Sequence, residues 1–128
     1  MTKRKTSIID FYEINDNNDQ VTLKYNLDFG QTADTSIRIN QQKIPNGDLE
    51  SFAGSFEVKL PTNNEILNKE LILTSVAYDI SDKTNKISLS ISLEGGVKDQ
   101  KWNLGPFDVE EGDTMLITAD IGFYKKNK

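Results

Sequence analysis

The stretch VTLKYNLDF, residues 21–29, decides the fold class of this 128-residue chain. Its apolar residues occupy every second position, and polar residues occupy the positions between them. Successive side chains of a β-strand point to opposite faces, so this alternation predicts an antiparallel strand with one buried face and one solvated face. Residues 86–94 and 114–123 alternate in the same way and predict two more such strands.

The segment before this strand, residues 7–14, also predicts a strand. The connecting residues 15–19 are all asparagine or aspartate. Both residue types tolerate turn conformations, so we expect residues 7–29 to form a β-hairpin.

Further strands are expected along the chain. A short one is predicted around residues 37–39 and is ended by the Pro-Asn-Gly turn at residues 45–47. Residues 52–60 predict a single strand with Gly54 in register. Residues 70–80 are apolar on both faces, which predicts a central strand that is covered on both sides.

Helical signal is limited to residues 63–71, with Asn64 as the N-cap residue. The chain is therefore expected to be all-β, with about seven or eight strands separated by regularly spaced turn signals. We predict a single domain over residues 1–128, an antiparallel β-sandwich of jelly-roll or immunoglobulin-like type.

The net charge of −5 is unevenly distributed. Removing the six cationic residues near the two ends leaves a net charge of −11 on residues 6–124. Such an acidic body repels nucleic acid, so no nucleic-acid partner is expected. The basic ends, residues 1–5 and 125–128, are expected to be short disordered tails, although a tail could also dock on the acidic body of a neighbouring copy.

The sequence contains no cysteine and no apolar run that would suit a signal peptide or a membrane span. A lack of cysteine fits a reducing compartment. We therefore expect a protein that is cytoplasmic, or exported without a conventional signal peptide, and that has no membrane partner.

The sequence also lacks histidine, which excludes Ser-His-Asp and Cys-His catalysis and histidine-bound metals. Glu110, Glu111 and Asp113 cluster around Gly112, as a glycosidase would need. Their surroundings predict a solvated hairpin turn, which offers both carboxylates the same water and no difference in pKa. We predict no enzyme activity, no catalytic residue and no cofactor.

Acidic loops raise calcium as an alternative ligand, and the candidates are residues 15–19 and the pair Asp79 and Asp82. The first segment lacks the glycine and the glutamate that an EF-hand loop has at its sixth and twelfth positions. Turn formation by the Asn and Asp side chains is the favoured interpretation, and no metal ligand is assigned.

Trp102, the single tryptophan, has two interpretations. On a strand that follows the turn at residues 95–96, its indole would pack in the core with Leu104 and Phe107, and its N–H would need a partner there. In an exposed loop it would offer a platform for a sugar or for a partner side chain. The core interpretation is favoured, and Trp102 and Phe107 are kept as candidate binding residues.

Ser88, Ser90 and Ser92 form the outward face of the strand predicted at residues 86–94. Edge strands usually carry charges that prevent association between sheets, whereas this serine ribbon is small and uncharged. The ribbon is either interior to a sheet, which is the favoured interpretation, or a docking surface that supports self-association.

These observations predict a non-enzymatic protein-interaction or self-assembly module that binds another protein, copies of itself, or both. Its candidate binding residues are Ser88, Ser90, Ser92, Trp102 and Phe107. The alternatives are a carbohydrate- or calcium-binding module and an acidic inhibitor or immunity protein that binds a basic partner. Sandwich folds host all three classes, so the fold alone does not rank them.

Overall fold

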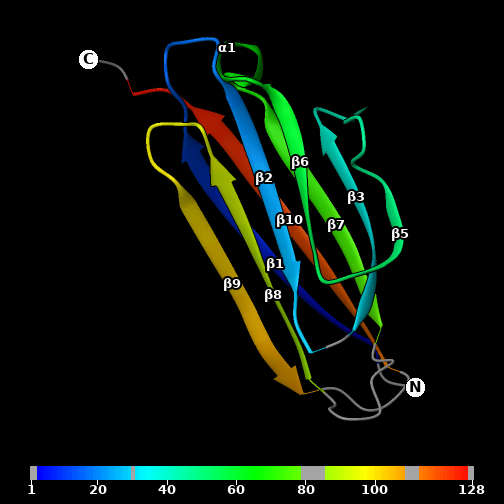
Figure 1. The fold of residues 1–128 in the computed structure, drawn as a ribbon. Coiled ribbons are helices and arrows are strands. Elements are labelled where there is room, and N and C mark those ends of the chain that lie inside the picture. The colour runs from blue at the N-terminus through cyan, green and yellow to red at the C-terminus, as the bar shows by residue number, and fades with distance from the viewer. Residues whose placement is uncertain (1–2, 30, 79–85, 109–112, 127–128) are drawn as a thin grey trace.

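The computed structural model describes residues 3–29, 31–78, 86–108 and 113–126. It consists of two β-sheets that pack face to face, which confirms the predicted all-β sandwich (Figure 1). The inward faces of both sheets supply the apolar side chains of one shared core.

The described residues form ten strands and one short helix. In chain order these are β1 (Lys3–Glu13), β2 (Gln20–Leu27), β3 (Thr32–Ile39), β4 (Gln42–Lys43), β5 (Leu49–Ala53), β6 (Ser55–Thr62), α1 (Asn63–Ile66), β7 (Glu70–Tyr78), β8 (Lys86–Glu94), β9 (Gln100–Asp108) and β10 (Thr114–Tyr124).

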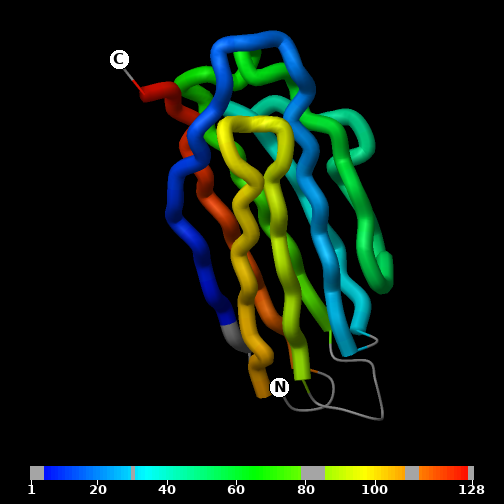
Figure 2. The backbone as a smooth tube through the Cα atoms, turned by 60° about the vertical axis from the view of Figure 1, so that its left-hand side comes forward, coloured from blue at the N-terminus to red at the C-terminus, as the bar shows by residue number. Residues whose placement is uncertain are grey.

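The two sheets differ in size. Sheet A has the strand order β1-β10-β7-β3-β4, and β5 also pairs with β3. Sheet B has the order β6-β2-β8-β9. The pairs are antiparallel except for β1 and β10, which run parallel to each other. Strands β1 and β9 therefore lie at edges of their sheets, and they run side by side along one flank of the sandwich (Figure 2).

The hairpin predicted over residues 7–29 is wrong. β1 belongs to sheet A and β2 to sheet B, so residues 15–19 connect the two sheets. β1 pairs along its full length with β10, at the other end of the chain. Turn-forming residues show where the chain changes direction, but they do not say whether the next strand stays in the same sheet.

The single strand predicted over residues 52–60 is also wrong, because the chain divides at Gly54. β5 pairs with β3 in sheet A, whereas β6 pairs with β2 in sheet B. Gly54 has a φ of +82°, a left-handed conformation that glycine adopts without steric cost. This one residue lets a run with a continuous apolar pattern pass from one sheet to the other.

The strand around residues 37–39 ends at Ile39, earlier than the turn predicted at residues 45–47. Asn40 and Gln41 have φ values of 47° and 72° and connect β3 to β4. Two consecutive residues with positive φ are typical of the tight turns that join antiparallel strands. Asn40 could have predicted this turn, because asparagine tolerates positive φ, whereas glutamine at position 41 does not indicate a turn.

The predicted helix is shorter than expected. It covers only Asn63–Ile66, with Thr62 rather than Asn64 at the N-cap position. Leu71, the last residue of the predicted helix, already belongs to β7. An isolated helix of this length is unstable, so its conformation depends on the packing of Ile66 in the core.

β7 is central, as predicted, with β10 on one side and β3 on the other. Its inner face, which includes Leu71 and Leu73, is buried. Its outer face is only half-buried at Ile72 and Val76, so the prediction that both faces are covered is wrong. Sheet A thus has a partly exposed apolar outer face.

The alternation in the sequence predicts that Leu23, Phe56, Leu89 and Ile117 face inward, and three of the four are confirmed as core residues. Leu23, Leu89 and Ile117 are buried, whereas Phe56 is half-buried and stacks on Tyr25. The Tyr25 hydroxyl also forms a 2.7 Å hydrogen bond with the Ser75 hydroxyl, which links sheet B to sheet A within the core. Burial raises the pKa of Tyr25, so the hydroxyl stays neutral there.

The two chain ends are more ordered than predicted. β1 begins at Lys3, so the expected disordered tail over residues 1–5 is wrong from Lys3 onward. Near the other end, Lys125 lies 3.5 Å from Asp16 and Lys126 lies 3.7 Å from Glu13. These two lysines therefore pair with acidic residues of their own chain. Residues 1–2 and 127–128 lie outside the described residues.

Candidate interaction surface

The serine ribbon of Ser88, Ser90 and Ser92 lies on β8, between β2 and β9 in sheet B. Both backbone edges of β8 are already paired, so the ribbon cannot add a strand from another molecule. The favoured interpretation of an interior strand with outward serines is therefore correct.

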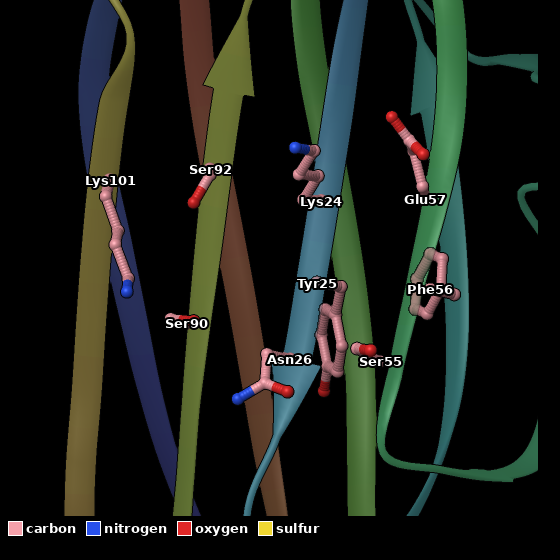
Figure 3. Close-up of a pocket in the computed structure, with 9 residues that line it drawn as sticks. All are labelled: Lys24, Tyr25, Asn26, Ser55, Phe56, Glu57, Ser90, Ser92 and Lys101. Atoms are coloured by element: carbon pink, nitrogen blue, oxygen red, sulfur yellow. The ribbon is translucent and has the colours of Figure 1, made fainter.

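Ser90 and Ser92 contribute to a shallow depression on the outer face of sheet B (Figure 3). Its volume is about 580 Å³. Ser90 and Ser92 lie between Lys101 on β9 and Lys24 on β2. Lys24 forms a 3.1 Å ion pair with Glu94. The depression offers small hydrogen-bonding groups but no large apolar side chain on its serine side.

Trp102 and Phe107 lie on the opposite face of the same sheet. They stand across from Ile91 and Ile87 on the inward side of β8, and both are half-buried against the core. The indole Nε1 of Trp102 donates a 2.8 Å hydrogen bond to Oδ2 of Asp10. The five predicted binding residues therefore do not come together, because the serines and the two aromatic residues lie on different faces.

Asp10 connects the two edge strands on this flank. Its Oδ2 accepts the Trp102 hydrogen bond from sheet B, and its Oδ1 accepts a 2.7 Å hydrogen bond from the backbone N–H of Phe11. These two hydrogen bonds, that of Trp102 first, lower the pKa of Asp10 below its ordinary value. The carboxylate is thus held in its charged form between β1 and β9.

The largest exposed apolar side chains of the described residues lie on β1. Ile9 is 80% exposed and Phe11 is 64% exposed. Phe11 lies against Gly122 of β10 and forms an edge-to-face contact with Tyr124, with 6.2 Å between ring centroids. Leu116, on the same outer face of β10, is 36% exposed. We call Ile9, Phe11, Leu116 and Tyr124 the outer patch.

Sequence reasoning missed the outer patch. The signal was present, because Ile8 and Ile9 are adjacent and so are Phe11 and Tyr12. Adjacent apolar residues on a strand point to opposite faces, so one of each pair must lie outward unless both faces are covered.

Two carboxylates adjoin the outer patch. Asp120 lies across from Ile9 in the register of β1 and β10, and its carboxyl group is close to that of Glu70. Hydrogen bonding with the Asp120 carboxyl group and the negative charge of Asp120 raise the pKa of Glu70. Among the described ion pairs, neither carboxylate has a cationic partner. The surface here combines exposed apolar side chains with uncompensated negative charge.

The acidic loop at residues 15–19 is held by Asn63, which is fully buried. Asn63 Nδ2 donates to Asn17 Oδ1 at 3.0 Å and to the backbone oxygens of Asp19 and Gly95 at 2.9 and 3.0 Å. Its Oδ1 accepts from the backbone N–H of Asn15 at 2.9 Å. The loop therefore uses polar groups to join neighbouring turns, as the turn interpretation predicted.

The acidic candidates of the sequence lie partly outside the described residues. The described residues contain no group of three acidic side chains that could hold a metal ion. Asp113 is buried, which contradicts the expectation of a solvated turn at that position. Glu110, Glu111, Asp79 and Asp82 lie outside the described residues.

The fold and the surface define a β-sandwich domain with an exposed apolar patch at one sheet edge. Comparison of the chain with protein-family models, with curated proteins and with solved structures found no match. Among the described residues, no helix has the length and apolar character needed to cross a membrane.

Proposed function

We propose that this protein is a non-enzymatic protein-interaction or self-assembly module, and that the outer patch binds its protein partner. The observation that carries this proposal is the exposure of Ile9 and Phe11, side by side on an edge strand. Apolar surface rimmed by polar groups is typical of protein interaction sites. Here the rim is supplied by Asp120 and Glu70 on the neighbouring strands.

The outer patch is favoured over the serine ribbon because of what each surface can gain on binding. The hydroxyl groups of Ser90 and Ser92 can hydrogen-bond to water on the unbound surface, so their burial in an interface would gain little free energy. Ile9 and Phe11 expose large apolar areas, and their removal from water on binding would contribute roughly 25 cal/mol per Å² of buried area before the costs of association.

The test compares substitutions on the two faces. Ile9→Lys should abolish binding to the protein partner, whether that partner is a second copy or another purified protein. Ser90→Lys is the matched control, because it places the same charge on the outer face of the other sheet, and it should leave binding unchanged. Binding is measured by sedimentation equilibrium for self-association and by titration calorimetry for a purified partner. Loss of binding in Ser90→Lys with retention in Ile9→Lys would instead assign the interaction to the serine ribbon.

A further inference from the structure

We infer that the partner is a second copy of this chain, joined through the outer edge of β1 in an antiparallel two-fold pairing with Ser7 at the axis. The inference rests on the proposed function and names the partner for the same surface. Four features of the flank support it: the unpaired backbone edge, the register that this edge permits, the distribution of charge, and the protection of the other edges.

The backbone of β1 offers an unpaired edge. Consecutive residues of a strand direct their backbone groups to alternate sides. The N–H of Phe11 bonds to the Asp10 side chain, and the C=O of Glu13 accepts a 3.1 Å hydrogen bond from Val97, so the odd-numbered residues point away from β10. Lys5, Ser7 and Ile9 share that direction, and no described strand pairs with β1 on that side.

The occupied groups limit the register of an added strand. Because the N–H of Phe11 and the C=O of Glu13 already have partners, the edge of β1 from Lys3 to Ile9 can pair without breaking an existing hydrogen bond. An antiparallel pairing with Ser7 facing Ser7 places Lys5 of each copy opposite Ile9 of the other. All the backbone groups of these three residues that face the edge then form hydrogen bonds.

Charge favours the antiparallel orientation. In a parallel pairing in register, Lys5 of one copy would lie beside Lys5 of the other, and like charges facing each other destabilise a sheet. In the antiparallel pairing, Lys5 lies beside Ile9 of the second copy, whose neighbour on β10 is Asp120. The exposed lysine thus approaches the Asp120 and Glu70 carboxylates, which have no described ion-pair partner.

The other described edges are poorer templates. Proline within a strand and short strand length protect edge strands from pairing. β6 carries Pro61, and β9 carries Pro106. β4 has only two residues and β5 only five. β1 has eleven residues without proline or glycine, and a two-fold axis closes its pairing into a dimer rather than a fibre.

The experiment uses the absence of native cysteine. Directly facing residues of a hydrogen-bonded antiparallel pair have Cα atoms about 5.5 Å apart. That spacing lies within the range of about 4.4–6.8 Å that a disulfide spans. Ser7→Cys should therefore form a covalent dimer on mild oxidation, and reductant should return it to the single-chain mass on a gel. Ser55→Cys, at an exposed serine on the opposite flank, is the matched control and should run at the single-chain mass on the gel with or without oxidation.

A mixing experiment tests the register. Lys5→Cys and Ile9→Cys should each fail to link alone, because neither residue faces its own copy, but a mixture of the two should form a disulfide-linked heterodimer. Efficient linking of Ile9→Cys alone would place the axis at Ile9 and would overturn the proposed register. Circular dichroism of each variant establishes that the fold is intact.

The outcomes separate this inference from the proposed function. A wild-type dimer in sedimentation, with linking through Ser7→Cys, supports both. A dimer that links through Ser55→Cys but not through Ser7→Cys overturns the β1 pairing. If the wild type sediments as a monomer, the inferred dimer is overturned. The proposed function would still hold if a different purified protein bound the wild type but not Ile9→Lys. If the wild type neither self-associates nor binds another protein through Ile9, both the inferred dimer and the proposed function are overturned.

Discussion

Asp10 joins two strands that belong to different sheets, and it does so with a charged group at a half-exposed edge. Its carboxylate accepts hydrogen bonds from the Trp102 indole and from the Phe11 backbone, and both favour the ionised form. The tryptophan that could have been a ligand platform is thus a structural contact between the sheets. The same contact leaves Phe11 on the outer side of β1, within the outer patch.

The Asp10–Trp102 hydrogen bond should make stability depend on acid. The pKa of Asp10 in the folded state lies below its ordinary value of 3.8, so this stabilisation is present above that value and is lost as the pH falls through the folded-state pKa. Urea denaturation of wild type and Trp102→Phe should therefore show a larger difference at neutral pH than in strong acid. An equal difference at both pH values would mean that the indole stabilises the protein only by packing.

Asn63 joins the loop at residues 15–19 to the turn at Gly95. Asn63→Ala would remove the partner of partly buried backbone groups of Asn15, Asp19 and Gly95, at a cost of about 1–3 kcal/mol for each group that water does not reach. Asn64→Ala is the matched control, because Asn64 bonds to Asn18 at an exposed site, and it should change stability by about 0.5 kcal/mol or less. Chemical denaturation measures both, and similar losses in the two variants would contradict the assigned role.

At the scale of elements, the backbone at Gly54 lets the chain leave sheet A after β5 and enter sheet B as β6, although the apolar pattern continues through both strands. A methyl group there would meet no atom within 4 Å, so any loss of stability on substitution comes from the backbone conformation. Gly54→Ala should cost roughly 1–2 kcal/mol because its φ of +82° is unfavourable for alanine.

Gly54→Asn provides the comparison, since asparagine tolerates positive φ better than alanine does. It should lose less stability than Gly54→Ala in the same thermal unfolding experiment. If the larger asparagine side chain were instead the more damaging of the two, the site would be limited by space rather than by φ.

β1 and β8 show why an uncharged strand face is a weak guide to association. The serine ribbon of β8 is free of charge because β8 is interior to sheet B, where strand pairing already protects it. β1 carries lysines and an aspartate yet presents the open edge. The tendency of a strand to associate follows from its position in the sheet as much as from its composition.

At the scale of the whole molecule, one core joins both sheets, so its stability should respond to substitutions in either. Leu23→Ala, Leu89→Ala and Ile117→Ala should each cost roughly 2–5 kcal/mol, because each removes a buried side chain and leaves a cavity. Phe56→Ala should cost less than Phe→Ala substitutions at fully buried sites do, because Phe56 is half-buried at the flank. Guanidinium denaturation measures all four, and unchanged midpoints for the three buried sites would show that the faces are assigned incorrectly.

Local alternation was sufficient to predict that this chain forms strands and which side chains face inward in β2, β8 and β10. The reason is that the period-two pattern records burial at each residue and needs no knowledge of distant partners. The predicted inward direction of Trp102 rested on the same pattern, together with the turn at residues 95–96.

Tertiary structure alone decided which strands became neighbours. The pairing of β1 with β10 brings the two ends of the chain together, and the passage of the chain from sheet A to sheet B at Gly54 leaves no mark in the alternation of apolar residues. The candidate surface depends on such pairings between residues that are distant in sequence. Ile9 and Phe11 are exposed because β1 lies at an edge where no described element covers its outer face, a condition set by the arrangement of the sheets and not by residues near them in sequence.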